Sequence, residues 1–127
     1  MVVGELVGIN NTWVRRKDAS GATYKIVDIT ELSLWKADYI KIVVSGTNTA
    51  NYAFVLVVFS KTGSELTVKA IRLGGNGYTS DLLEIIKRNN VLYIKAVKDN
   101  NMYISECLYN IQRELTDISD GEIIPIS

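Results

Sequence analysis

Histidine and cysteine, two residue types that often carry catalytic or metal chemistry, are almost missing from this chain. Its 127 residues include no histidine and a single cysteine, Cys107. The chain therefore lacks the commonest metal ligand and the usual general base near neutral pH, and one cysteine forms neither an internal disulfide nor a Cys-based zinc site. We expect no metal, no cofactor and an inert, half-buried Cys107. These features favour a protein that is not an enzyme.

A glycine-rich segment, residues 74–80, is the first candidate for a binding site. It lacks the Lys-Ser/Thr ending of a phosphate-binding P-loop and the third glycine of a dinucleotide fingerprint. It does present Tyr78 beside small polar residues, and sugars pack on aromatic rings while amides and hydroxyls bind their hydroxyl groups. We predict Tyr78 and Asn76 as the first ligand contacts, with Asp99 and Asn100 behind them. An ordinary surface loop is the alternative.

Acidic residues could do chemistry only if the fold brought the right ones together. Asp117, Asp120 and Glu122 crowd one segment, but their spacing matches no calcium-binding loop, so a solvated acidic turn is the better interpretation. A carboxylate pair for glycoside hydrolysis could come from elsewhere, although no spacing selects one. Its candidate members are Asp28, Glu31, Asp38, Glu84 and Glu106.

The two tryptophans lie close to basic residues in the sequence. Trp13 precedes two arginines, and Trp35 precedes a lysine. Such amphipathic groups pack at the rim of a core or in a subunit interface more often than they form a ligand platform. We therefore expect packing roles for both rings.

Charge and hydropathy exclude two classes of partner. The chain has 14 basic and 14 acidic side chains, so no overall field attracts a polyanion, and we expect no nucleic-acid partner. Residues 1–9 are apolar but short and contain Glu5, which fits neither a secretory signal nor a membrane span. We expect no membrane insertion.

Alternating apolar residues predict strands along most of the chain. Residues 38–44 place Ile40, Ile42 and Val44 on one buried face. Residues 52–59 are apolar on both faces, which calls for cover from a second sheet or from a neighbouring subunit. A hairpin turn at residues 60–64, with Gly63 available for a positive φ, leads to a strand at residues 65–73. These two strands should pair antiparallel.

The remaining elements are shorter. Residues 80–87 suit a capped helix or a strand, and we favour the strand because its surroundings are β. Asn89 and Asn90 are expected to form a turn that leads into residues 91–97. Residues 91–97 and 102–109 are expected to form a second hairpin, and Pro125 makes residues 122–126 a short edge strand. Three further strand candidates are residues 6–9, 12–15 and 24–29, and residues 31–37 form a connection.

Roughly eight to ten short strands at regular spacing predict an all-β fold, an antiparallel β-sandwich or jelly roll. We expect one domain over residues 1–127. Its head-like part would span residues 35–127, and residues 1–34 would be a neck or extra strands.

The stretch from Trp35 to Tyr109 resembles the C-terminal head domains of bacteriophage tail-fibre and receptor-binding proteins. In those heads a strand like residues 39–42 precedes a long apolar strand and a Gly-centred hairpin, here residues 52–64. A segment like residues 92–96 and a last strand like residues 102–109 follow, and residues 123–127 look like such a chain end. The resemblance covers about three fifths of the chain and transfers no individual binding residue.

The resemblance implies a virion tail component, assembled in the host cytoplasm as a homotrimer, that adheres to a glycan or protein receptor on the host cell surface. Weak contacts at single sites would be multiplied by this valency. Two alternatives remain open: a structural tail or baseplate assembly module without an external ligand, and an accessory carbohydrate-binding domain of a bacterial glycan-utilisation protein.

Overall fold

Two five-stranded β-sheets form the part of the chain that the computed structural model describes, residues 12–18, 21–46, 50–98, 100–105 and 109–127. The first sheet has the strand order β1-β8-β3-β4-β5, and the second has the order β10-β6-β7-β2-β9. The strands of the first sheet are β1 (Thr12–Asp18), β3 (Ala37–Gly46), β4 (Tyr52–Thr62), β5 (Glu65–Asn76) and β8 (Asn100–Ser105). Those of the second are β2 (Thr23–Asp28), β6 (Leu83–Arg88), β7 (Val91–Ala96), β9 (Gln112–Glu114) and β10 (Glu122–Ile124).

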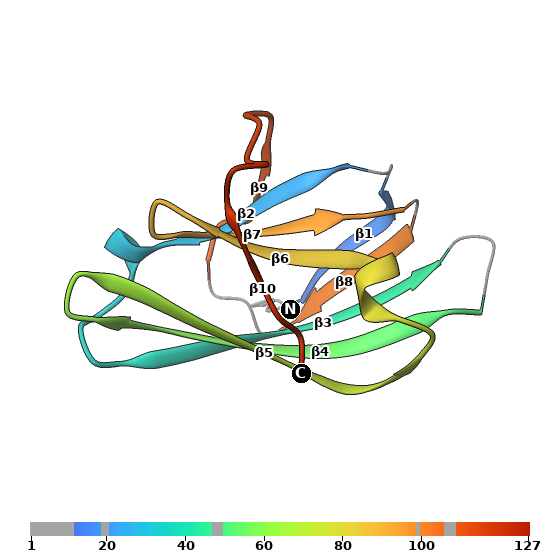
Figure 1. Ribbon diagram of the computed structural model, residues 1–127, viewed down its shortest axis with the longest axis horizontal. Helices are drawn as coiled ribbons and strands as arrows, with labels where there is room; N and C mark the ends of the chain where they lie inside the picture. The colour runs from blue at the N-terminus through green and yellow to red at the C-terminus, as the bar shows by residue number, and fades with distance from the viewer. Residues whose placement is uncertain (1–11, 19–20, 47–49, 99, 106–108) are drawn as a thin grey trace, which may run out of the picture.

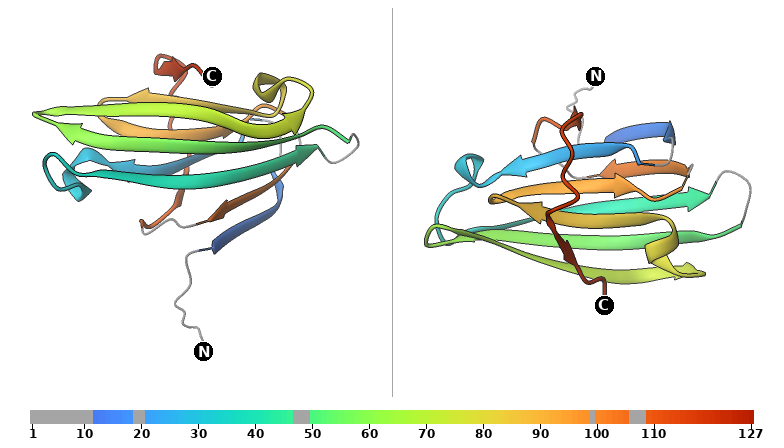
Figure 2. Two further views of the ribbon diagram at one scale, coloured as in Figure 1. Left: turned by 90° about the horizontal axis from the view of Figure 1, so that it is seen from below. Right: turned by 45° about the horizontal axis from the view of Figure 1, so that its top comes forward.

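The sheets lie in two layers, and strands within each layer pair antiparallel (Figures 1 and 2). The prediction of an all-β, mostly antiparallel chain is therefore confirmed. The predicted strand at residues 6–9 and Cys107 lie outside the described residues.

One apolar core fills the space between the layers, and the predicted alternation places its residues. Ile40, Ile42 and Val44 of β3 have no exposed surface, as predicted. From the second sheet, Ile85 and Ile94 are equally buried in the same cluster. Burial of such side chains contributes roughly 1.5–3 kcal/mol each, so this core is the main source of stability.

Two tight turns follow the sequence prediction. Gly63 has a φ of +64° in the turn between β4 and β5, and these strands pair antiparallel. Asn89 and Asn90 have φ of +51° and +59° in the turn between β6 and β7, as expected of a two-residue hairpin turn with two positive φ angles. Asparagine tolerates this region better than most residues because its short side chain can hydrogen-bond locally.

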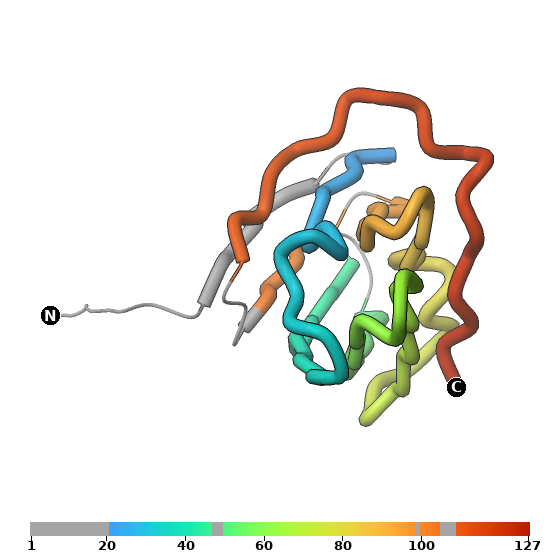
Figure 3. The backbone as a smooth tube through the Cα atoms, turned by 90° about the vertical axis from the view of Figure 1, so that its left-hand side faces the viewer, coloured from blue at the N-terminus to red at the C-terminus, as the bar shows by residue number. Residues whose placement is uncertain are grey.

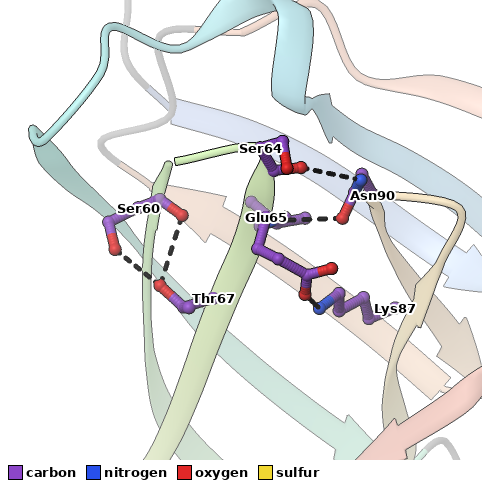
Figure 4. A network of polar contacts seen from close by, with 7 residues as sticks. Ser60, Ser64, Glu65, Thr67, Lys87 and Asn90 are labelled. Atoms are coloured by element: carbon purple, nitrogen blue, oxygen red, sulfur yellow. Dashed lines mark hydrogen bonds and ion pairs between the residues drawn. The ribbon is translucent and has the colours of Figure 1, made fainter. Parts of the chain in front are cut away.

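Asn90 also joins the two sheets. Its side-chain N–H donates to the carbonyl of Ser64 at 3.2 Å, and its Oδ1 accepts from the backbone N–H of Leu66 at 3.1 Å (Figure 4). Beside it, Lys87 of β6 forms an ion pair with Glu65 of β5 at 3.3 Å. This end of the molecule is therefore held by polar contacts between the layers.

The predicted second hairpin is wrong, because β7 and β8 belong to different sheets. The backbone N–H of Val97 donates to the carbonyl of Leu82, and the chain then passes from the second sheet to the first. In the first sheet β8 pairs with β1 and β3. Each strand has one buried face, so its apolar pattern is the same whether or not the next strand is its partner.

Two further boundaries differ from the prediction. Strand β5 continues past Leu73 to Asn76. Gly74 and Gly75 still pair with β4, after a register shift between residues 54 and 55 of that strand. A short 3-10 helix, η2 (Thr79–Asp81), precedes β6, and the preferred strand then follows over Leu83–Arg88.

The connection after β2 contains a second 3-10 turn, η1 (Ile29–Glu31), capped by Asp28. The Asp28 carboxylate accepts from the backbone N–H of Thr30 at 3.0 Å, and Glu31 accepts from the backbone N–H of Asp28 at 2.8 Å. The bond from Thr30 is the main reason that the pKa of Asp28 lies below its ordinary value.

The last described residues bridge the two layers. β10 pairs with β6 as an outer strand of the second sheet, as Pro125 predicts. The chain then reaches β5 of the first sheet, where Ser127 exchanges backbone hydrogen bonds with Ala70 and Arg72. Figure 3 shows this terminal segment, in red, running along one side of both layers.

Candidate functional site

The loops that carry the predicted contact residues gather at one end of the sheets, on the right of Figure 1. Asn76 is paired with Tyr52, and Asn100 is paired with Gly46. The carbonyl of Leu82 accepts from the side chain of Asn100, so the segment after Tyr78 is tied to the same corner. Loops far apart in the sequence therefore meet here.

Asn76 ends β5 and has a structural contact. Its Oδ1 accepts from the backbone N–H of Tyr52 at 2.9 Å, which fixes the end of the β4-β5 ladder. Asn76 is otherwise exposed, and it lies two residues before Tyr78 in the chain. Asn76 therefore lies close to Tyr78 in the chain and is held in place.

Asn100 does not reach the surface. Its side chain is fully buried, and its Nδ2 donates to the carbonyls of Leu82 at 3.0 Å and Lys98 at 2.9 Å. The residue holds the passage between the sheets together, so we leave it out of the contact set. Asp99, the other residue predicted there, lies outside the described residues.

Tyr78 is the most exposed of the tyrosines that the structure describes, at 76 %. It borders a pocket of about 330 Å³ between β5, η2 and the terminal segment. Polar and charged groups of Arg72, Ser80 and Glu84 also line this pocket, and Ile123 and Pro125 supply apolar surface. We call it the Tyr78 pocket.

The backbone before Tyr78 is braced. Arg72 donates from Nη1 to the carbonyl of Gly77 at 2.8 Å and from Nε to the carbonyl of Gly74 at 3.3 Å. Gly75 and Gly77 have φ of +139° and +71°, and a side chain on Gly75 would lie 2.4 Å from the carbonyl oxygen of Tyr52. This segment needs glycine and holds Tyr78 on a fixed base.

A second cavity, of about 450 Å³, lies on the outer face of the second sheet, under the segment that joins β9 to β10. Ile118 of that segment packs on Ile86 and Tyr93 of the sheet, which holds it down. Burial is the main reason that the pKa of the Tyr93 phenol lies above its ordinary value. We call this cavity the strap cleft.

Charged and polar side chains cross the floor of the strap cleft. Glu84 of β6 lies opposite Lys95 of β7, Lys95 lies opposite Thr23 of β2, and Thr23 lies opposite Glu114 of β9. Above them Asp117 accepts from the backbone N–H of Ser119 at 2.9 Å, the main reason that its pKa lies below the ordinary value. No local sequence signal identifies this cleft, because its residues come from five strands, β2, β6, β7, β9 and β10, and from the loops beside them.

The outer face of the first sheet is apolar and open. Lys41 and Lys69 contribute the charges in its middle rows, among half-buried Phe54, Leu56 and Val58 of β4. Exposed apolar side chains surround them: Tyr39, Val43, Tyr52, Ile71, Leu73 and Tyr103. A patch of this kind is typical of a surface that contacts another molecule. We call it the apolar face.

Trp35 lies in the connection into β3 and is 71 % exposed, so it does not pack at the rim of the core. Its φ is +66°, an uncommon value for a bulky residue. The side chain of Trp13 lies outside the description. A role for either ring in an interface stays a prediction.

Among the described residues, the carboxylates weighed for hydrolysis lie at three separate places in the fold. Asp28 and Glu31 cap η1, Asp38 accepts from the Tyr109 hydroxyl at 2.6 Å, and Glu84 lies in the other sheet. Glu106 lies outside the description. Among the residues with assigned positions, no group of three or more metal-ligating side chains is placed to hold an ion.

No helix in the described part of the chain is both long and apolar enough to cross a membrane. No protein-family model matches the chain, and comparisons with curated proteins and with solved structures found no match either.

Proposed function

We propose that this chain is a non-enzymatic adhesin head of a phage tail, a β-sandwich of the jelly-roll kind that contacts a saccharide or protein on the host cell surface. In this proposal it is assembled in the host cytoplasm and acts in the virion. The architecture of two antiparallel sheets with loops gathered at one end supports it. The sequence resemblance supplies the biological setting.

The observation that carries the proposal is Tyr78, a largely exposed aromatic ring on a braced backbone, beside a pocket that both polar and apolar side chains line. An exposed ring costs little to order when its backbone is already fixed, so its apolar surface is available to a ligand. Arg72, Ser80 and Glu84 offer donors and acceptors for hydroxyl groups. This combination suits a sugar ring better than a charged polymer.

A homotrimer is part of the proposal, and the apolar face is the surface that would be buried. The outward side chains of β4 call for cover that the described part of the chain does not give, because Phe54, Leu56 and Val58 remain half-buried. Association through this face would leave the Tyr78 pocket accessible, since the pocket lies beside the terminal segment that bridges the layers.

The test combines solution mass with binding. Light scattering is expected to give three times the 14.1 kDa chain mass. On an array of bacterial surface glycans, Tyr78→Ala should lose at least about tenfold in affinity, the cost of about 1.4 kcal/mol of lost ring contact, and Tyr78→Phe should retain most of it. Trp35→Ala, which removes an exposed ring at the opposite end, is the matched control. Wild-type binding by Tyr78→Ala would refute the proposed site.

The apolar face also favours a second candidate, a tail or baseplate assembly module without an external ligand. In that case Tyr78→Ala would impair assembly with other tail proteins and no glycan would be bound. A monomer that binds glycans through Tyr78 would instead point to an accessory carbohydrate-binding domain.

A further inference from the structure

The Tyr78 pocket and the strap cleft share two lining residues, Glu84 and Ile123. The cavities therefore meet on the surface of β6 and β10. We call the two adjoining cavities the groove; they extend from Tyr78 past Glu84 and across the outer face of the second sheet to Thr116. A ligand that fills both parts must be longer than one sugar ring.

The register of the second sheet gives the length of the groove beyond Glu84. The row from Glu84 through Lys95 and Thr23 to Glu114 crosses three strand intervals. Neighbouring strands lie about 4.8 Å apart, so this row spans about 14 Å. The Tyr78 pocket extends the groove at the Glu84 end, which gives room for several linked sugar rings.

The groove alternates acceptors and donors in a way that suits amide groups. Glu84 accepts, the Lys95 ammonium donates, and the Thr23 hydroxyl, which donates to the carbonyl of Gly21 at 3.2 Å, can accept. No ion pair joins Glu84 to Lys95 in the described part of the chain, so each charged group can form hydrogen bonds with a ligand. The strap cleft has three carboxylates against two cations, which does not favour a polyanion.

Apolar surface lies beside these polar groups. Ile86 lines the strap cleft and Ile123 lines both cavities. An acetamido group on a sugar has an N–H for the Glu84 carboxylate, a carbonyl for the Lys95 ammonium and a methyl group for the isoleucines. A plain hexose lacks the methyl and the amide.

We propose that this groove binds an extended oligosaccharide of N-acetylated aminosugars, with one ring on Tyr78 and the following units across Glu84, Lys95 and Thr23. The inference rests on the proposed saccharide-binding function and assigns its ligand class and the extent of its site.

The experiment is calorimetric titration of the full chain with N-acetylglucosamine oligomers of two, four and six units and with glucose oligomers of the same lengths. We expect affinity for the N-acetylated series to rise at least tenfold from two to four units and to exceed that of the glucose series. Lys95→Ala should weaken the four-unit oligomer about fivefold or more and leave the two-unit oligomer nearly unchanged. Lys25→Ala, on the same outer face but outside the groove lining, is the matched control.

Three results would overturn the inference: an affinity that does not depend on length, equal binding of the two series, or equal effects of Lys95→Ala and Lys25→Ala. In each of these cases a loss of binding in Tyr78→Ala would leave the proposed function intact. If no oligomer binds while another glycan on the array binds through Tyr78, the assignment to aminosugars is refuted. Thermal melting of each variant separates loss of binding from loss of fold, and Lys95→Arg should keep part of the affinity.

Discussion

Replacing Gly75 by alanine tests whether the backbone that positions Tyr78 depends on the irregular end of β5. Gly75 has a φ of +139°, and a Cβ there would lie 2.4 Å from the carbonyl oxygen of Tyr52 and 2.9 Å from the Cα of Ala53. Both contacts are to backbone in the neighbouring strand, which cannot move aside without breaking the ladder. Strain at such a φ costs about 1–3 kcal/mol, and a forced overlap adds about 1–3 kcal/mol.

Gly74→Ala is the matched control, because a Cβ at Gly74 meets nothing within 4 Å and its φ is ordinary. We expect Gly74→Ala to stay within about 0.5 kcal/mol of the wild type. Gly75→Ala should lose about 2–6 kcal/mol, which for a chain of this size lowers the melting temperature by roughly 6 °C or more.

The assay is urea unfolding followed by tryptophan fluorescence and circular dichroism, at one protein concentration for all variants because association changes apparent stability. The reasoning is refuted if Gly75→Ala unfolds like the wild type, or if Gly74→Ala loses as much as Gly75→Ala. A destabilised but folded Gly75→Ala should also bind glycans less tightly, because the segment that carries Tyr78 moves with the strand end.

Two further predictions concern stability. Asn90→Gly keeps a positive φ accessible but removes both side-chain hydrogen bonds between the layers, so it should lower the free energy of unfolding in urea by about 1–3 kcal/mol. Asn89→Gly, one residue earlier in the same turn, is the control and should be nearly neutral. Equal effects of the two substitutions would show that these hydrogen bonds contribute nothing to stability. The pKa of Asp28 is lowered in the folded state from an ordinary value of 3.8, so its carboxylate stabilises the fold above that pH and loses this effect as the pH falls through the folded pKa. The difference in unfolding free energy between wild type and Asp28→Asn should therefore narrow between pH 7 and pH 3, and a difference that does not depend on pH would contradict this assignment.

Local patterns were enough to predict most elements. Alternation at Ile40, Ile42 and Val44 identified the buried face of β3, and Gly63 and the Asn89-Asn90 pair located two turns. These features depend only on residues that are close together in the chain, so they can be predicted from a single sequence. The sheet to which a strand belongs depends on residues far away in the sequence, and for this reason the prediction that β7 pairs with β8 was wrong.

The candidate site was predictable only in part for the same reason. Tyr78 could be chosen because it follows several glycines and lies beside small polar residues in the sequence. Its pocket could not be predicted, because Arg72, Glu84 and Ile123 meet only when the terminal segment bridges the sheets. Asn100 was chosen as a polar turn residue, but its Nδ2 donates to carbonyls at positions 82 and 98 inside the molecule, and no local pattern indicates such partners.

The contacts that link the layers have a second consequence, which concerns aggregation. β5 is the outermost strand of the first sheet, and an unpaired strand of 12 residues would be a template for pairing with another chain. The outward N–H of Leu66 is occupied by Asn90, and Ser127 occupies the carbonyl of Ala70 and the N–H of Arg72. The second sheet and the terminal segment thus occupy part of the outward backbone of β5, which hinders the addition of another strand at this edge.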